Sequence, residues 1–206
     1  MKTKNHDKAH QGSTTGSATE IQQFGTVIGR PISLDNKVRQ TSCEKLNQIL
    51  ADTITLRDMY KKHHWQVSGP TFYQLHLLFD KHYGEQAELV DALAERVQTL
   101  GGVAIAMAHD VAETTHVNRP PRGREDSTVQ LFRLIEAHEL IIGETREAAE
   151  RASDSGDDGT NDLLVSQILR TNEFQVWFLS EQIAGSGISD REGEGAGEAV
   201  AARRGH

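Results

Sequence analysis

The sequence predicts an all-α protein, a four-helix bundle with a long crossover between its second and third helices. A length of 206 residues favours one domain with tails. Aromatic residues at 5 % and a total of four prolines fit an all-β sandwich or barrel poorly. Between the two ends, apolar residues recur at helical spacing in four long segments, and strand-like alternation is scarce.

The first helix is expected to begin near Ser33 or Asp35, because both residue types commonly cap helix N-termini. Apolar residues then repeat with helical spacing from Val38 to Tyr60. The sequence Ser-Gly-Pro at 68–70 predicts the end of this helix.

The second helix is expected from Thr71 to Leu100, followed by a stop at Gly101-Gly102. The crossover covers about 103–125, with a short helix near 104–113. The third helix spans roughly 126–152. A turn rich in aspartate, serine and glycine separates it from the fourth, at roughly 160–184.

The expected bundle domain is residues 31–184, between a flexible N-terminal tail at 1–30 and a flexible C-terminal tail at 185–206. Both tails are rich in glycine or small polar residues, which have little apolar surface to offset the entropy of ordering.

Charge and cysteine content exclude several classes of function. The formal net charge of −8 argues against a nucleic-acid footprint over the whole chain. A single cysteine, Cys43, excludes an intrachain disulfide framework and a cysteine-rich metal site. With no apolar membrane span or signal-like segment, we expect a cytoplasmic protein.

The second predicted helix carries a polar stripe made of His76, Asp80, Asp91 and Glu95. Its members form two pairs with a spacing of four residues, and helical geometry places all four on one face. His76 and Glu95 are nonetheless about 28 Å apart along the axis. One copy of the helix cannot bring both pairs to one metal ion.

Two antiparallel copies of this helix would bring the pairs together, because the stripe is symmetric about a point close to Gly84 and Glu85. A two-fold axis there sets His76 and Asp80 of one chain opposite Asp91 and Glu95 of the other. Imidazole with carboxylate suits iron, manganese or zinc more than calcium or magnesium. An exposed stripe of charge pairs is the alternative interpretation.

A dense signature over residues 60–102 resembles the Dps family, the DNA-binding proteins from starved cells, which are mini-ferritins with a ferritin-like fold. The matching segments are Lys-His-His-Trp-Gln-Val-Ser-Gly at 62–69, Phe72, Leu75-His76, Phe79-Asp80, Asp91, Ala94-Glu95-Arg96 and Leu100-Gly101-Gly102. The order of the predicted helices fits the family from about 33 to 184.

This resemblance implies a hollow homododecamer that oxidises Fe(II), preferentially with hydrogen peroxide, and stores ferric mineral, which protects DNA. It implies a two-iron ferroxidase centre between subunits, at which zinc or manganese can compete. The implied ligands are His64, His76 and Asp80 of one subunit with Asp91 and Glu95 of the other. Trp65, beside the centre, resembles the family's radical trap.

Asp157, Asp158 and Asp162 lie at the start of the fourth predicted helix. Acidic residues there complement the helix dipole and favour turns. In relatives, a similar segment lines negatively charged three-fold pores that admit Fe(II), so a role in iron entry is the second interpretation.

Several other residues attract notice. His63 is expected on a helix surface, and Trp177 in the core. His82 lies off the stripe, with a role as an auxiliary metal ligand left open. The E-x-x-H string at 113–116 occurs once, whereas a di-iron site within one bundle needs two copies, so we discount it and place His116 at the surface or in packing.

Two other functions compete with ferroxidation. One is a structural, DNA-compacting protein of the nucleoid whose metal site is secondary. The lysines of residues 1–20 support it weakly, and twelve copies would add avidity, but the net charge opposes it. The other is a metal-dependent bundle enzyme outside the ferritins, such as a manganese protein.

Overall fold

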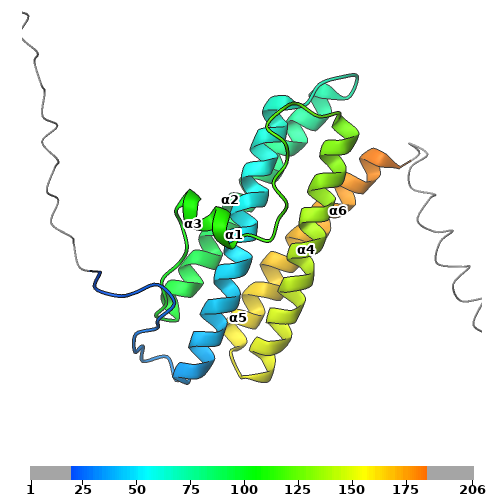
Figure 1. Cartoon of the computed structure of the whole chain (residues 1–206). Helices are drawn as coiled ribbons and strands as arrows, with labels where there is room; N and C mark the ends of the chain where they lie inside the picture. The colour runs from blue at the N-terminus through cyan, green and yellow to red at the C-terminus, as the bar shows by residue number, and fades with distance from the viewer. Residues whose placement is uncertain (1–19, 185–206) are drawn as a thin grey trace, which may run out of the picture.

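The computed structural model describes residues 20–184, and this part of the chain contains helices and no strand (Figure 1). The all-α prediction is therefore confirmed. The elements are α1 (Asn36–Gln66), α2 (Phe72–Thr99), α3 (Ala108–Thr114), α4 (Ser127–Asp154), α5 (Asp158–Leu163), the π-helical segment η1 (Leu164–Leu169) and α6 (Arg170–Ile183).

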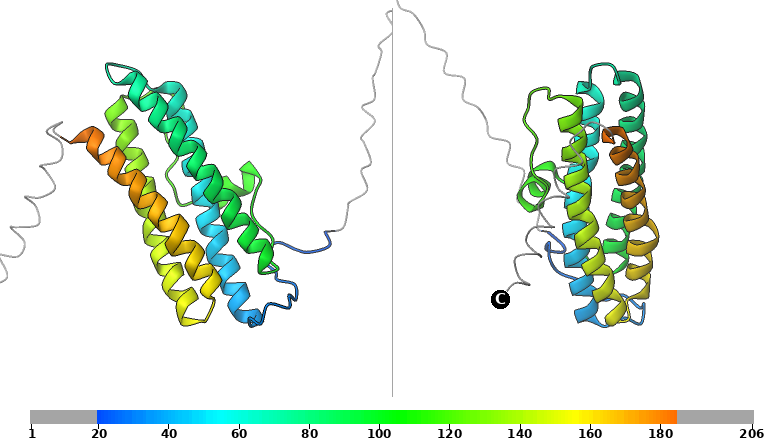
Figure 2. Two further views of the ribbon diagram at one scale, coloured as in Figure 1. Left: turned by 180° about the vertical axis from the view of Figure 1, so that it is seen from behind. Right: turned by 90° about the vertical axis from the view of Figure 1, so that its right-hand side faces the viewer.

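Two helical hairpins form the bundle. α1 packs along α2, α4 packs along the column formed by α5, η1 and α6, and α1 joins the hairpins through its contact with α4. Figure 2 shows these four columns with nearly parallel axes, and the crossover and α3 lie on the outer side of α1 and α4. The largest fully buried side chains come from all four columns, including Tyr60, Phe79, Ile141 and Leu164.

Both ends of the α1–α2 hairpin form as their residues predict. Asp35 is the N-cap of α1, and α2 ends before Gly101, which has a φ of 88°. The amides of Gly101 and Gly102 donate to the carbonyls of Gln98 and Val97, both at 3.0 Å. A Cβ on Gly101 would overlap a backbone carbonyl, so glycine is required there by both conformation and space.

Residues 20–30 contact the bundle, although the sequence assigned them to the N-terminal tail. Gln22 Nε2 and the Ile28 amide both donate to the Gly101 carbonyl at 2.9 Å. Arg39 Nη1 donates to the carbonyls of Ile28 at 2.6 Å and Leu100 at 2.9 Å. The anchored part of the chain therefore begins before residue 31. The expected tails at 1–19 and 185–206 lie outside the described residues.

The last column contains a π-helical turn where a continuous helix was predicted. Beyond η1, Asn172 and Gln175 of α6 are fully buried. Asn172 Oδ1 accepts from His138 Nδ1 at 2.7 Å, and Gln86 Nε2 donates to Gln175 Oε1 at 3.0 Å. The π turn thus directly precedes a buried polar network inside the bundle. Such turns are frequent at functional sites in helices.

Two predictions about exposure were wrong. His63 is fully buried, because α1 lies between α2 and α4 and is covered on more than one face. Trp177 is 56 % exposed and lies in an aromatic cluster on α6, with ring centroids 5.8 Å from Phe174 and 5.1 Å from Phe178. The spacing of apolar residues shows which of them lie on the same helix face. Whether that face is covered depends on how the helices pack.

Candidate metal centre

The end of α1 and the start of α2 bring His64 and His76 together. His64 Nδ1 donates to the His76 carbonyl at 2.8 Å, and His76 Nδ1 donates to the His64 carbonyl at 2.9 Å. Their rings stack with centroids 3.8 Å apart. Because each Nδ1 carries the donated proton, each Nε2 of a neutral ring is left as the nitrogen that can bind a metal.

Asp80 adds a carboxylate to this histidine pair. Asp80 Oδ1 lies 3.9 Å from His64 Nε2 and accepts a hydrogen bond from Lys61 Nζ at 2.6 Å. That bond lowers the pKa of Asp80, so the carboxylate is ionised and already holds a cationic group. The arrangement of two imidazoles and a carboxylate suits iron or zinc.

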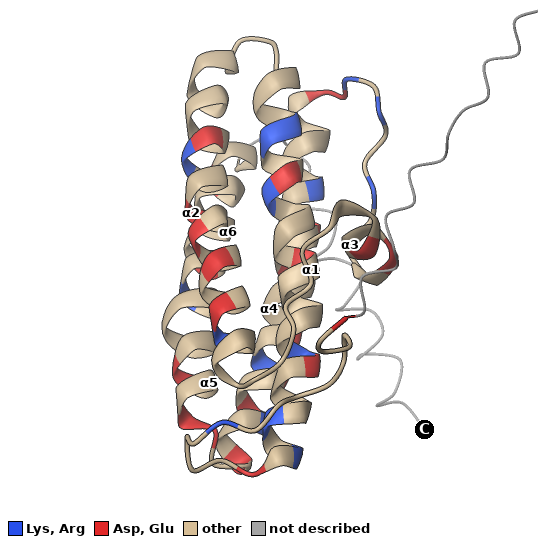
Figure 3. Ribbon diagram, turned by 90° about the vertical axis from the view of Figure 1, so that its left-hand side faces the viewer, with Lys and Arg blue, Asp and Glu red and all other residues tan. Residues whose placement is uncertain are grey.

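Asp91 and Glu95 are exposed on α2 and do not join His76 within one chain. From His76 to Asp91 the helix rises about 22 Å. The structure therefore brings together three of the five predicted ligands and leaves the other two further along the same helix. Figure 3 shows acidic residues at successive levels along the α2 and α6 side of the bundle. The pairing of two chains stays a prediction.

Large apolar side chains close to the two histidines in sequence are exposed, and the Phe72 ring lies 5.2 Å from the His76 ring between centroids. Trp65 is 70 % exposed and Tyr73 66 %, and Leu77 and Phe72 are also open to solvent. Several large apolar side chains left open to solvent in one region are typical of a surface that contacts another protein. The surroundings of the site thus favour a partner chain over free solvent.

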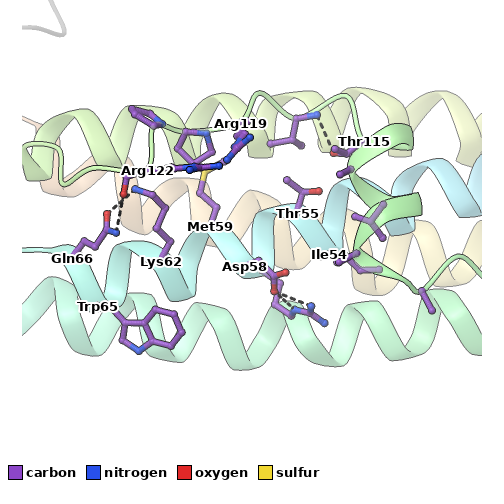
Figure 4. A pocket seen from close by; sticks show the side chains of 18 residues that line it. Ile54, Thr55, Asp58, Met59, Lys62, Trp65, Gln66, Thr115, Arg119 and Arg122 are labelled. Atoms are coloured by element: carbon purple, nitrogen blue, oxygen red, sulfur yellow. Dashed lines mark hydrogen bonds and ion pairs between the residues drawn. The ribbon is translucent and has the colours of Figure 1, made fainter. Parts of the chain in front are cut away.

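A cavity between α1, α3 and the crossover is a separate feature. It has a volume of about 660 Å³ (Figure 4). Apolar side chains such as Met59 meet the cationic Lys62, Arg119 and Arg122 in its wall, and Trp65 lies at one end. His64, His76 and Asp80 do not line it, so it is not the metal centre.

The structure of the single chain shows the surroundings of His82 and Asp157, for which the sequence left two roles open. His82 is fully buried and donates from Nδ1 to the Tyr60 hydroxyl at 3.1 Å, so it is a packing residue. Asp157 is also buried: it accepts from Ser42 Oγ and from Arg96 Nη2, both at 2.6 Å. Its role as a pore residue is therefore corrected to that of a structural cap, whereas Asp158 and Asp162 are exposed.

Sequence reasoning missed a second polar cluster. His116 meets Asp52 of α1 and Glu144 of α4, and Glu113 takes no part. The hydrogen bond to Glu144 raises the pKa of His116, and burial raises the pKa of Glu144. The members come from three distant segments, so no spacing in the sequence could have indicated them.

Comparisons with known proteins agree with this description. A ferritin-like domain model matches residues 43–185. DpsC from Streptomyces coelicolor is 58 % identical with a TM-score of 0.80, over 81 % of this chain and 96 % of that chain. A nutrient stress-induced DNA-binding protein of Nostoc sp. is 36 % identical over 155 residues, which are 75 % of this chain and 84 % of the relative.

A Dps protein from Vibrio cholerae O1, a member of a broad superfamily of ferritin-like diiron-carboxylate proteins, is 25 % identical with a TM-score of 0.71, over 79 % of this chain and 99 % of that chain. The chain is a helical bundle with a long crossover, and a ferritin-like domain model matches most of its length. These two observations define it as a ferritin-like protein. Within that class, the chain belongs to the Dps family. The described helices include none long and apolar enough to cross a membrane.

Proposed function

We propose that this protein is a ferroxidase and iron store whose active centre is completed by a second copy of the chain. The observation that carries the proposal is the reciprocal histidine pair, in which both Nδ1 atoms are held by carbonyls and both Nε2 atoms remain for metal. Asp80 stands beside that pair. A two-fold axis near Gly84 would set Asp91 and Glu95 of the other copy opposite it.

In this proposal Fe(II) is the substrate and the chain supplies its ligands. His64 and His76 bind iron through Nε2, and Asp80 helps to hold it. Asp91 and Glu95 of the partner copy neutralise the charge of a second Fe(II). Each iron gives one electron to hydrogen peroxide, which takes up two protons and leaves as two water molecules. Peroxide is the proposed preferred oxidant, and its two-electron reduction by a pair of irons avoids the hydroxyl radical that single-iron chemistry would release.

Two further residue roles belong to the same proposal. Trp65 follows His64 directly and is 70 % exposed, and we assign its indole the role of scavenging a radical that escapes from the centre. Asp158 and Asp162 are exposed carboxylates at the start of the last column. Grouped around a three-fold axis of a dodecamer, they would draw Fe(II) toward the cavity that stores ferric mineral.

The test is to replace the two carboxylates that act across the interface. D91A combined with E95A should abolish rapid oxidation of Fe(II) by peroxide and leave helix content unchanged, because both residues are exposed. Fe(II) is loaded without oxygen, peroxide is injected, and ferric absorbance is followed together with its elution with the protein. Zinc and manganese are added separately as competitors.

A matched control replaces Glu136 and Glu139, two exposed glutamates of α4, by alanine. This control should oxidise iron like the unchanged protein. Oxidation by the Asp91 and Glu95 variant at the unchanged rate would contradict the proposed centre.

DNA compaction within the nucleoid is the second candidate, and the DNA-binding name of the Nostoc relative favours it. The net charge of −8 per chain opposes strong attraction to phosphate. Retention of duplex DNA by the protein, falling steeply as salt is raised, would make compaction the primary function. The match to the ferritin-like domain model argues against the third alternative, a metal-dependent bundle enzyme outside the ferritins.

A further inference from the structure

Three segments that are distant in the sequence bring one histidine and two carboxylates together on the far side of α1 from α2. Asp52 comes from α1, His116 from the crossover just after α3, and Glu144 from α4. One ligand atom from each lies within 4.8 Å of the other two. This spacing is close to what the coordination sphere of one ion requires.

Asp52 is held rigidly in this cluster. It is fully buried, and its Oδ1 accepts from Thr115 Oγ1 at 2.7 Å and from the His116 amide at 2.6 Å. Gln48 Nε2 donates to the other oxygen, Oδ2, at 2.8 Å. Ligands fixed by such outer hydrogen bonds are a feature of built metal sites.

Glu144 leaves one oxygen without a partner. Its Oε1 is bonded to His116 Nδ1 at 2.7 Å, but its Oε2 is buried and has no hydrogen-bond donor. A buried carboxylate oxygen that lacks a donor is costly, and a second carboxylate in the same cluster adds repulsion. A cation between Glu144 and Asp52 removes both costs.

The cluster is open to solvent on one side. A cavity of about 380 Å³ has His116 and Glu144 in its wall, together with Glu44, Lys45 and Glu147. The His116 side chain is 58 % exposed, whereas Asp52 is fully buried. An ion could therefore enter from the cavity and keep water as its remaining ligands.

We propose that Asp52, His116 and Glu144 form a second site for a divalent transition metal ion, separate from the His64 and His76 centre and contained within one chain. One imidazole with two carboxylates suits Fe(II), Mn²⁺ or Zn²⁺ better than Ca²⁺, which prefers six or more oxygen ligands. When the ion binds, His116 releases its Nδ1 proton to solvent and exchanges its hydrogen bond to Glu144 for a bond to the metal. The ion ties the crossover to α1 and α4.

The test uses Co²⁺ as a visible probe on the full-length protein. H64A combined with H76A provides a background in which the other centre no longer binds. In that background we expect saturable Co²⁺ binding with a visible ligand-field band, lost when either H116Q or E144Q is added. Both changes leave fully buried Asp52 in place, and circular dichroism checks that helix content is unchanged.

E147Q is the matched control, because Glu147 lies one turn further along α4, faces the same cavity and bonds to Lys45 at 3.0 Å. The control should bind Co²⁺ like the background. Unchanged binding by H116Q and E144Q, equal loss in E147Q, or no saturable binding in the background would each overturn the proposal. Because the background lacks the His64 and His76 centre, these outcomes do not depend on ferroxidation.

Discussion

At the scale of single residues, a histidine side chain can face a metal site or pack in the core, depending on what its two ring nitrogens contact. His64 and His76 present Nε2 because carbonyls hold both Nδ1 atoms. His138 is fully buried, with Nδ1 on Asn172 and Nε2 accepting from the Tyr60 hydroxyl at 2.6 Å. Burial lowers the pKa of His138 to about 3, so this ring stays neutral. The proposed metal centre therefore uses His64 and His76, which are partly exposed and keep Nε2 free of hydrogen bonds, whereas His138 is fully buried with both ring nitrogens bonded.

His63 gives a prediction about pH, because both its ring nitrogens are buried without partners. Burial lowers its pKa to about 4 in the folded protein. Between pH 6.5 and 4 the unfolded chain takes up a proton that the folded chain refuses, so the free energy of unfolding falls as the pH falls. H63L removes this loss, and its stability relative to the unchanged protein should rise by about 2 kcal/mol between pH 7.5 and pH 5.

Urea unfolding at the two pH values measures this difference. If the free energies of unfolding of H63L and the unchanged protein fell in parallel as the pH was lowered, His63 would not be the group that titrates.

At the scale of elements, one ion pair between partly buried Arg96 and fully buried Asp157 joins the two hairpins. Arg96 near the end of α2 bonds to Asp157, the N-cap of α5, which also bonds to Ser42 of α1. The start of the last column is therefore fixed against both helices of the first hairpin. In the sequence Asp157 resembled its exposed neighbour Asp158. In the structure its carboxylate accepts hydrogen bonds from Ser42 and Arg96 instead of facing solvent.

D157A should lower the free energy of unfolding by about 3 kcal/mol, because it removes the carboxylate partner of partly buried Arg96 and a helix cap. D158A is the matched control: Asp158 is exposed in the first turn of the same helix, so its loss should cost less than about 1 kcal/mol. Thermal or chemical unfolding distinguishes the two. Equal stability of D157A and D158A would show that the Arg96–Asp157 pair contributes nothing to holding α5.

At the scale of the whole molecule, the proposed pairing of two chains uses the exposed face of α2. Gly84 is exposed there, and a Cβ placed on it would meet no other atom of the chain within 4 Å. Within one chain nothing requires glycine at this position. In the proposed two-fold pair it lies where the two α2 helices cross.

G84K should therefore leave the single chain folded and block the pairing of chains. Gly143 of α4 is an exposed helical glycine with equal free space, so G143K is the matched control for the loss of helix flexibility and for added charge. Light scattering after size-exclusion chromatography should give a smaller mass for G84K than for G143K. A full-sized assembly of G84K would contradict the crossing near Gly84.

The sequence determined which segments are helical and which residue types can bind metal. Asp35, Gly101 and the Ser-Gly-Pro turn are local signals, since capping and backbone conformation depend on a few neighbouring residues. Spacing of four residues indicated the stripe on α2 for the same reason. Tertiary structure decided everything that depends on which faces meet: the burial of His63 and Asp157, the exposure of Trp177, and the meeting of Asp52, His116 and Glu144. These outcomes depend on contacts between distant segments, because a helix face becomes a core, a cap or a metal ligand set only when another element packs against it.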